Sequence, residues 1–373
     1  MIEISLCMIV RNEENSLPRC LSSVGAIADE IIIVDTGSTD NTKEIALSYG
    51  AVIYDFTWID DFSAARNFAF SKATKEYIFW LDADDYLKDV DHARFRELKH
   101  SLPDGVDSVN MQYNLAFDGE GRVVTSLRRN RLVRRSCNFK WIGPVHEYLE
   151  VYGPAYSSDV CITHEKDKVY TDRNLRIYQK RVAEAEVFSP RDQYYYANEL
   201  RDHGIYEEAC RYYELFLDGG LGWIEDSYQA CLRLAECQER LGDREGAFQS
   251  LCRTLQYDTP RAEFCCRLGA WHVEKDQLLP AVYWYELAIK LPRNNDSMGV
   301  KNEAFATWVP NLQLALCYDR LGQREKANLF NEAALLYHPV HPSMLYNRNY
   351  FKNVLGDHYV ELHSREAGEK EAE

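Results

Sequence analysis

The stretch Tyr77-Ile-Phe-Trp-Leu-Asp-Ala-Asp-Asp85 predicts a buried β-strand that ends in a cluster of carboxylates. An uninterrupted apolar run of this length is typical of a strand covered on both faces. Asp82 and Asp84 stand two residues apart directly after it, so they can share one site, with Ala83 between them. Mg²⁺ and Mn²⁺ prefer oxygen ligands. The stretch therefore predicts a metal site with Asp84 as the preferred direct ligand. Asp82 is expected to bind the metal directly, to bind it through a water molecule, or to contact the ribose. The alternative is a solvated acidic turn.

Two upstream apolar runs have the same design. Residues 4–10 precede Arg11-Asn12-Glu13, and residues 31–34 precede Asp35. Helical patterns follow each run, over residues 16–24 and from residue 40 or 41 to Gly50, so the first third predicts an open α/β sheet of parallel strands. Ligands of such sheets bind outside the carboxyl ends of the strands, which predicts that Asp35, Asp82 and Asp84 converge on one crevice.

Composition excludes several classes of protein. The formal net charge of −16 disfavours nucleic acid and anionic membranes as partners. No apolar run approaches the roughly 20 residues of a membrane helix, and the start at Met1 lacks a signal-peptide pattern. The 11 cysteines are scattered without paired CxxC spacing, as expected in a reducing compartment. We therefore predict a soluble, cytoplasmic protein that is not an integral membrane protein.

The second half of the chain predicts helical repeats. Helix formers and aromatic residues dominate after Tyr170, and a degenerate pattern aligns Gly204, Gly242, Asp276 and Gly322 with small residues at fixed offsets. The pattern resembles tetratricopeptide repeats, whose stacked helices make a surface for a peptide or a second copy of the chain. The predicted boundaries are an α/β domain over 1–168, a linker helix over 169–192, repeats over 193–342, and a helix with a frayed acidic tail over 343–373.

Four separate segments of the first 85 residues resemble the family-2 glycosyltransferases of the GT-A fold. They are Cys7-Met-Ile-Val-Arg-Asn-Glu-Glu14, Asp29-Glu-Ile-Ile-Ile-Val-Asp-Thr-Gly-Ser-Thr-Asp-Asn-Thr42, Phe62-Ser-Ala-Ala-Arg-Asn67 and the acidic cluster. The resemblance implies a nucleotide-sugar donor, an inverting transfer and a Mn²⁺ or Mg²⁺ ion. The fold class is then a GT-A α/β domain followed by an all-α, tetratricopeptide-like repeat domain.

The resemblance also implies which residues bind the nucleotide. The end of the first strand, with Val10, Arg11 and the nearby Glu13, and the aspartate that ends the second, Asp35, correspond to the positions that hold the base and ribose. For Asp35 the alternative is a cap or turn. Arg66 and Asn67 are expected to line a helix that faces the nucleotide, where Arg66 orders Asp82 or contacts a phosphate. The alternative for Arg66 is a surface ion pair with Asp60 or Asp61.

A later set of segments resembles the bacterial family-2 enzymes that build lipopolysaccharide cores. The set comprises Arg131-Leu-Val-Arg134, Trp141-Ile-Gly-Pro-Val-His-Glu147 and Ile162-Thr-His164. We expect Glu147 to be the general base, with Asp85 as the alternative and His146 as a further catalytic candidate. We expect His164 to be an extra metal ligand and Arg131 or Arg134 to contact the diphosphate. For each of these residues a structural role is the alternative.

The function predicted from these patterns is transfer of a hexose or N-acetylhexosamine from a UDP-sugar to a peptide or protein side chain. The acceptor follows from the repeats and from a resemblance to repeat-bearing family-2 enzymes, among them S-glycosyltransferases of bacteriocin peptides. The repeats would present the acceptor or form a homodimer. One alternative is transfer to an envelope glycan or lipid-linked saccharide. Another is a non-catalytic, nucleotide-binding scaffold.

Overall fold

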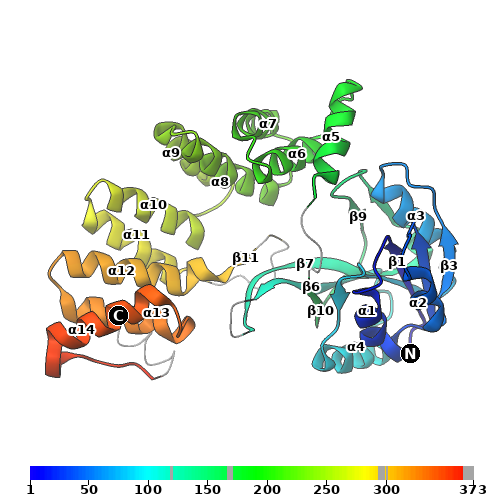
Figure 1. The fold of residues 1–373 in the computed structure, drawn as a ribbon, viewed down its shortest axis with the longest axis horizontal. Helices are drawn as coiled ribbons and strands as arrows, with labels where there is room; N and C mark the ends of the chain where they lie inside the picture. The colour runs from blue at the N-terminus through cyan, green and yellow to red at the C-terminus, as the bar shows by residue number, and fades with distance from the viewer. Residues whose placement is uncertain (118–120, 166–170, 293–298, 300, 364–373) are drawn as a thin grey trace. The chain divides into compact units, whose positions relative to one another are not determined.

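The computed structural model describes residues 1–117, 121–165, 171–292, 299 and 301–363. Contacts within the chain separate two units, with the division after Gly204. The first unit is an α/β domain, and the second consists of helices (Figure 1). Within the described residues, no helix combines the length and apolarity that a membrane crossing requires.

The α/β unit is built on a mixed sheet with the strand order β3-β2-β1-β4-β7-β6-β10-β5 (Figure 1). The predicted parallel strands are present, because β1 pairs in parallel with β2 and β4, and β2 with β3. Strand β7 then pairs antiparallel with β4. The bounds are β1 Ile4–Val10, β2 Glu30–Asp35, β3 Val52–Asp55, β4 Tyr77–Trp80, β5 Asp85–Tyr86, β6 Ser108–Phe117, β7 Val123–Arg134 and β10 Ala155–His164.

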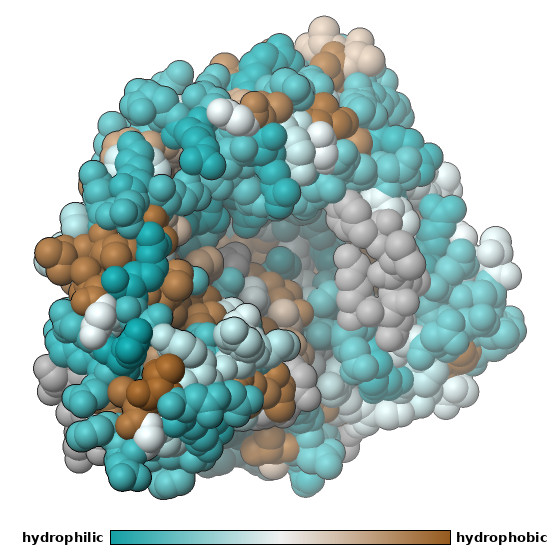
Figure 2. Space-filling view, turned by 60° about the vertical axis from the view of Figure 1, so that its left-hand side comes forward, coloured by the Kyte–Doolittle hydropathy of each residue, from teal (hydrophilic) through white to brown (hydrophobic). Residues whose placement is uncertain are grey.

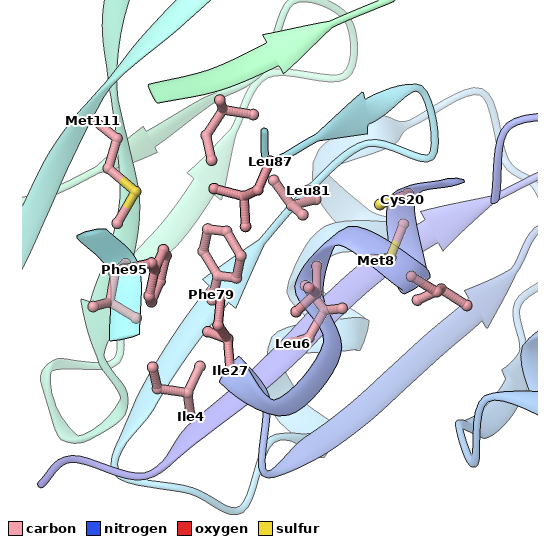
Figure 3. Close-up of a cluster of buried hydrophobic side chains, with 14 of the residues drawn as sticks. Ile4, Leu6, Met8, Cys20, Ile27, Phe79, Leu81, Leu87, Phe95 and Met111 are labelled. Atoms are coloured by element: carbon pink, nitrogen blue, oxygen red, sulfur yellow. The ribbon is translucent and has the colours of Figure 1, made fainter. Parts of the chain in front are cut away.

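Side chains of successive strand residues enter two different cores, as strand geometry requires. On one face, Leu6 and Met8 pack with Phe79 and with helices α1 (Leu17–Val24) and α4 (Asp89–Ser101), as Figure 3 shows for the labelled residues. On the other face, Cys7 packs with Trp80, with helix α3 (Phe62–Lys72) and with the hairpin of β8 (Lys140–Ile142) and β9 (Tyr148–Glu150). Helix α2 (Thr42–Ser48) connects β2 to β3. The two cores fix the strand ends from both sides.

Helices α5 (Arg173–Ala183) and α6 (Pro190–Asp202) belong to the α/β unit. Tyr178 of α5 is fully buried, donates a hydrogen bond to the Val145 carbonyl at 3.5 Å, and packs against Phe188 and Tyr196. The sequence had predicted a linker helix and the start of the repeats here. This packing groups both helices with the sheet.

The second unit is a series of packed helices, and it confirms the predicted repeat architecture. Adjacent helices pack on one another along the series, and Gly269 lies so close to Tyr285 that an added Cβ would stand 2.8 Å from its ring. Gly242 and Gly322 have positive φ angles in the turns.

Apolar patches interrupt the hydrophilic face shown in Figure 2. The bounds are α7 Tyr206–Gly219, α8 Ile224–Arg240, α9 Arg244–Arg253, α10 Ala262–Glu274, α11 Leu278–Lys290, α12 Trp308–Arg320, α13 Arg324–Tyr337 and α14 Pro342–Leu355.

Candidate active site

A cleft of about 1180 Å³ opens at the carboxyl ends of β1 and β4 in the α/β unit. This is where ligands of open α/β sheets bind. The structure brings most of the predicted site residues to its wall. The predicted residues that line it are Val10, Arg11, Glu13, Arg66, Asp82, Ala83, Asp84, His146, Glu147 and His164. Their individual roles remain predictions.

Arg66 of α3 joins the two carboxylates that border the cleft. Its Nη2 donates to Asp82 Oδ1 and its Nε donates to Glu147 Oε1, both at 2.6 Å. The guanidinium also lies 5.0 Å from the ring centre of Trp80 and 4.8 Å from that of Trp141, so it is held on the aromatic core. The contact of Arg66 with Asp82 is the arrangement that the sequence predicted.

Electrostatics around Arg66 keep Arg66 and Asp82 charged. Burial disfavours the charged form of Arg66, but the charges of Asp82 and Glu147 outweigh it and raise the pKa of Arg66. Burial alone would raise the pKa of Asp82, whereas the nearby charges of Arg66 and Arg131 hold that pKa well below its usual range. Asp82 is therefore a carboxylate throughout the neutral pH range.

The predicted alternative for Arg66, a surface ion pair, is not formed. Asp60 instead accepts a hydrogen bond from Lys180 at 3.0 Å. Asp61 caps α3 by accepting from the Ala64 amide at 2.9 Å. Both neighbouring aspartates are therefore engaged elsewhere, which leaves Arg66 to the cleft.

Among the described residues, Asp84, Asp85 and His164 form a group that could hold a metal ion. One ligand atom from each lies within 4.8 Å of the others. His164 Nδ1 stands 3.2 Å from Asp85 Oδ1 and 3.4 Å from Asp84 Oδ1. Burial lowers the pKa of His164, but hydrogen bonds to the two aspartates outweigh it and raise that pKa to about 10. Two carboxylates and an imidazole suit Mn²⁺, because a cation can replace the shared proton.

Asp85 lies below the cleft surface, which corrects its prediction as an alternative base. It is fully buried, and Arg131 Nη1 lies 2.9 Å from its Oδ2. Tyr113 Oη donates to its Oδ1 at 2.8 Å, and the Asp82 amide donates to its Oδ2 at 3.1 Å. A carboxylate so enclosed cannot reach an acceptor in the cleft. Asp85 positions the loop and His164 instead.

The predicted diphosphate contact of Arg131 is corrected for the same reason. Its guanidinium is fully buried, 3.9 Å from the ring centre of Trp80 and 4.4 Å from that of Tyr113. The register between β6 and β7 passes from Val109↔Leu132 directly to Asn110↔Asn130, which leaves Arg131 in a bulge. At this bulge the Arg131 side chain is buried in the core, and the alternation of side chains along a strand does not predict that orientation.

Arg129, which no sequence motif indicated, is the arginine of this segment that lines the cleft. It lies 5.3 Å from the ring centre of Tyr113, and its charge contributes to the low pKa of Asp82. In the sequence, Arg129 is marked only by its place in the arginine-rich stretch 128–131. A cation at this position faces the acidic cluster from β7.

Arg134 lies at the other end of β4, so its predicted diphosphate contact is wrong. The antiparallel register places Arg134 opposite Tyr77, at the start of β4, whereas Asp82 follows the end of that strand. At about 3.3 Å per residue these positions are roughly 16 Å apart. Arg134 pairs there with Glu76 and Asp107, each at 3.3 Å.

Asp35 and Asn67 do not line the cleft but fix backbone near it. Asp35 accepts from the amides of Gly37 and Ser38 at 3.1 and 3.0 Å, which is the turn role weighed as its alternative. Asn67 exchanges two 2.9 Å hydrogen bonds with the backbone of Trp141. Their predicted nucleotide contacts remain predictions.

His146 joins the β8–β9 hairpin to α6. Its Nε2 lies 2.7 Å from Glu199 Oε1, and its ring stacks on Tyr195 at 4.5 Å. Arg191 donates to the His146 carbonyl at 3.0 and 3.1 Å. These contacts give His146 a structural role at the cleft wall, and its predicted catalytic role remains a prediction.

The fold and the site define an α/β protein with a strand-end cleft suited to a divalent cation. Residues 5–148 match the family model described as Glycosyl transferase family 2. This segment is therefore a family 2 glycosyl transferase domain, and the predicted GT-A fold followed by helical repeats is confirmed.

Similar proteins carry both parts of this architecture in their names. A TPR repeat-containing protein of Synechococcus elongatus is 41% identical over 150 residues, 40% of this chain and 36% of its own. The SPbeta prophage-derived glycosyltransferase SunS of Bacillus subtilis is 27% identical over 227 residues, 56% of this chain and 52% of its own. The chain thus spans between about a third and a half of these relatives.

Likeness to solved structures is weaker. Glucosyl-3-phosphoglycerate synthase from Mycobacterium tuberculosis, solved with Mn²⁺ and UDP-glucose, aligns with a TM-score of 0.35 at 12% identity, over 51% of this chain and 81% of that one.

Proposed function

We propose that this chain is a metal-dependent glycosyltransferase that moves a hexose or N-acetylhexosamine from a UDP-sugar to an acceptor with inversion. The observation that carries the proposal is one cleft, lined in part by the family 2 segment, in which Asp84 and His164 lie beside the carboxylates held by Arg66. The alternative of a non-catalytic scaffold would not need these charges to converge on a cleft.

The donor half of the site is assigned to Asp84, His164 and Arg129. Asp84 and His164 would hold Mn²⁺ or Mg²⁺, and Asp82, kept ionised by Arg66, would act on a metal-bound water or the ribose. A bound cation would offset the charge that develops on the departing diphosphate. Arg129 replaces Arg131 and Arg134 as the proposed protein cation on the diphosphate. The end of β1, with Val10 and Arg11, is proposed to hold the nucleotide base.

Glu147 is proposed as the base that takes the acceptor's proton. Arg66 Nε fixes Glu147 Oε1 at 2.6 Å, whereas no partner for Oε2 occurs among the described residues. One oxygen is thus oriented, and the other is left to accept a proton. A single base without a nucleophile attached to the sugar corresponds to direct displacement and inversion.

The proposed acceptor is a peptide or protein side chain. The helical unit supports this, because stacked helix pairs offer an extended surface to a peptide or to a second copy of the chain. Transfer to an envelope glycan is the second candidate, and it rests on the Arg-rich and Val-His-Glu segments rather than on any contact.

A panel of UDP-sugars with Mn²⁺ tests the proposal directly. We expect one donor to release UDP slowly to water and faster when a peptide acceptor is added. Faster release with saccharides alone would assign a glycan acceptor. No release from any donor, with any acceptor, would contradict the glycosyltransferase proposal and favour the scaffold.

A further inference from the structure

One wall of the cleft lies outside the family 2 segment and carries only positive charge among its ionisable side chains. Helices α5 and α6 contribute Arg173, Arg176, Lys180 and Arg191 to the lining. Within the described part of the chain, neither helix adds an aspartate or a glutamate to that lining. We call these four cations the α5–α6 wall. It stands out because the whole chain has a formal net charge of −16.

The cations of α5 form a row along one side of the helix. Arg173, Arg176 and Lys180 have the i, i+3, i+7 spacing that places side chains on one face. A rise of 1.5 Å per residue separates them by about 4.5 and 6 Å along the axis. Arg176 pairs with Asp172 at 2.5 Å and Lys180 with Asp60 at 3.0 Å, but both pairs are largely exposed and therefore weak.

Arg173 has no carboxylate partner among the described residues. Its guanidinium lies 4.6 Å from the ring centre of Phe62. Burial and, next, repulsion by the nearby charge of Arg11 lower the pKa of Arg173, and together they outweigh the charges of Glu147, Glu13 and Glu199, which raise it. A bound anion would relieve this repulsion.

Arg191 is held in place before any ligand arrives. Its guanidinium lies 4.8 Å from the ring centre of Tyr148 and 4.5 Å from that of Tyr195. It also donates to the His146 carbonyl at 3.0 Å. An arginine fixed in this way loses little conformational entropy when it meets a carboxylate.

We propose that the α5–α6 wall binds an acceptor peptide with acidic residues beside the glycosylated side chain, an inference that rests on the proposed function. In the proposed function, the donor phosphates are bound through Asp84, which follows β4, and through His164 of β10 and Arg129 of β7. The four cations are spread over two helices instead of converging on one point. Such spacing fits several carboxylates of an extended chain, whose alternate side chains lie about 6.6 Å apart, better than it fits a single phosphate.

The proposal is tested with labelled 12-residue peptides in which a central serine is flanked by glutamate, by glutamine or by lysine. Binding to the full chain is measured by fluorescence anisotropy with saturating UDP and Mn²⁺, so that the donor site is filled. We expect the glutamate peptide to bind about tenfold more tightly than the glutamine peptide, which is the size of effect two or three charge pairs produce. Non-specific attraction would favour the lysine peptide, because the chain is acidic.

A matched pair of double variants locates the effect. Arg173→Gln/Arg176→Gln is expected to weaken the glutamate peptide about fivefold and leave the glutamine peptide unchanged. The control Arg96→Gln/Lys140→Gln removes the same charge from exposed positions that do not line the cleft and is expected to change neither peptide. The thermal unfolding midpoint of each variant shows that the chain is folded.

Three outcomes would overturn the inference. The first is equal binding of the glutamate and glutamine peptides. The second is a loss of glutamate-peptide affinity in the control variant equal to that in Arg173→Gln/Arg176→Gln. The third is that Arg173→Gln/Arg176→Gln loses UDP affinity but still discriminates between the peptides. Two results together would assign the wall to a phosphate instead. The chain would show no preference for the glutamate peptide over the glutamine peptide, and glucose 6-phosphate, but not glucose, would displace the glutamate peptide. Failure of the wild-type chain to bind UDP would contradict the proposed function itself and is read independently of the peptides.

Discussion

Each unit of the molecule contains an arginine–glutamate pair with one buried member, Arg66 in one pair and Glu332 in the other, and the two pairs differ in what surrounds them. In the α/β unit, Arg66 joins Glu147 to a second carboxylate, Asp82, on the wall of a cleft. In the helical unit, Arg348 of α14 donates to the fully buried Glu332 of α13 and ties two packed helices together. A buried ion pair is therefore weak evidence of function by itself. Convergence of several charges on a cleft is what distinguishes the first pair.

The largest expected effect is that of Asp84→Asn on transfer. Loss of the ligand charge should lower kcat by about a thousandfold, because a metal site of this kind contributes several kcal/mol to the transition state. The rate of UDP release with the best donor measures it. Asp104→Asn, an exposed position that does not line the cleft, is the control. Near-normal turnover in Asp84→Asn would remove the metal assignment.

Glu147→Gln should reduce kcat by about a hundredfold, which is typical of a lost general base. The amide keeps the size of the side chain and an oxygen for Arg66, so UDP affinity in the presence of Mn²⁺ should stay within about twofold. Parallel measurements of kcat and UDP affinity separate the two effects. Unchanged turnover would place the base elsewhere, and an equal loss of UDP affinity would give Glu147 a binding role instead.

Arg129→Gln should weaken UDP about tenfold and leave uridine unaffected, because a charged hydrogen bond to phosphate contributes about 1.5 kcal/mol or more. Calorimetric titration of both ligands measures the difference. Arg134→Gln is the matched control from the same strand, at the far end from the acidic cluster. Equal losses for UDP and uridine would contradict a phosphate contact.

Arg348→Met should have the smallest effect on transfer, with kcat unchanged. It should nevertheless destabilise the helical unit by about 1–3 kcal/mol, because Glu332 loses its charge partner while it stays buried. Chemical denaturation measures the stability, and UDP release measures the activity. A loss of activity in a chain that remains folded would show that the helical unit takes part in the chemistry. The Arg348–Glu332 pair would then not be purely structural.

Local patterns sufficed to predict three parallel strands of the sheet and the acidic cluster, but not the antiparallel strands that complete the sheet. Apolar runs followed by polar residues identify β1, β2 and β4 because strand burial and strand ends are encoded within a few residues. The same local pattern predicted that Asp35, Asp82 and Asp84 converge on one crevice. Asp82 and Asp84 do line one cleft together with the end of β1, whereas Asp35 does not line it.

Long-range partners decided what the sequence could not predict. Asp85 is removed from the cleft by Arg131 and Tyr113, which are distant in sequence, and Arg131 in turn lies in a β-bulge that strand periodicity does not reveal. Helices α5 and α6 have an ordinary helical pattern, and only the packing of residues such as Tyr178 assigns them to the α/β unit. For this reason, no sequence motif predicted that the cations of the α5–α6 wall line the cleft.

Binding of Mn²⁺ to the full chain, followed by electron paramagnetic resonance with and without UDP, tests the central claim most directly. We expect wild-type protein to bind Mn²⁺ more tightly when UDP is present, and Asp84→Asn to lose that enhancement. Identical Mn²⁺ binding by the two proteins, or UDP binding that does not depend on Mn²⁺, would contradict the claim that the Asp82–Asp84 cluster holds a cation for a nucleotide sugar.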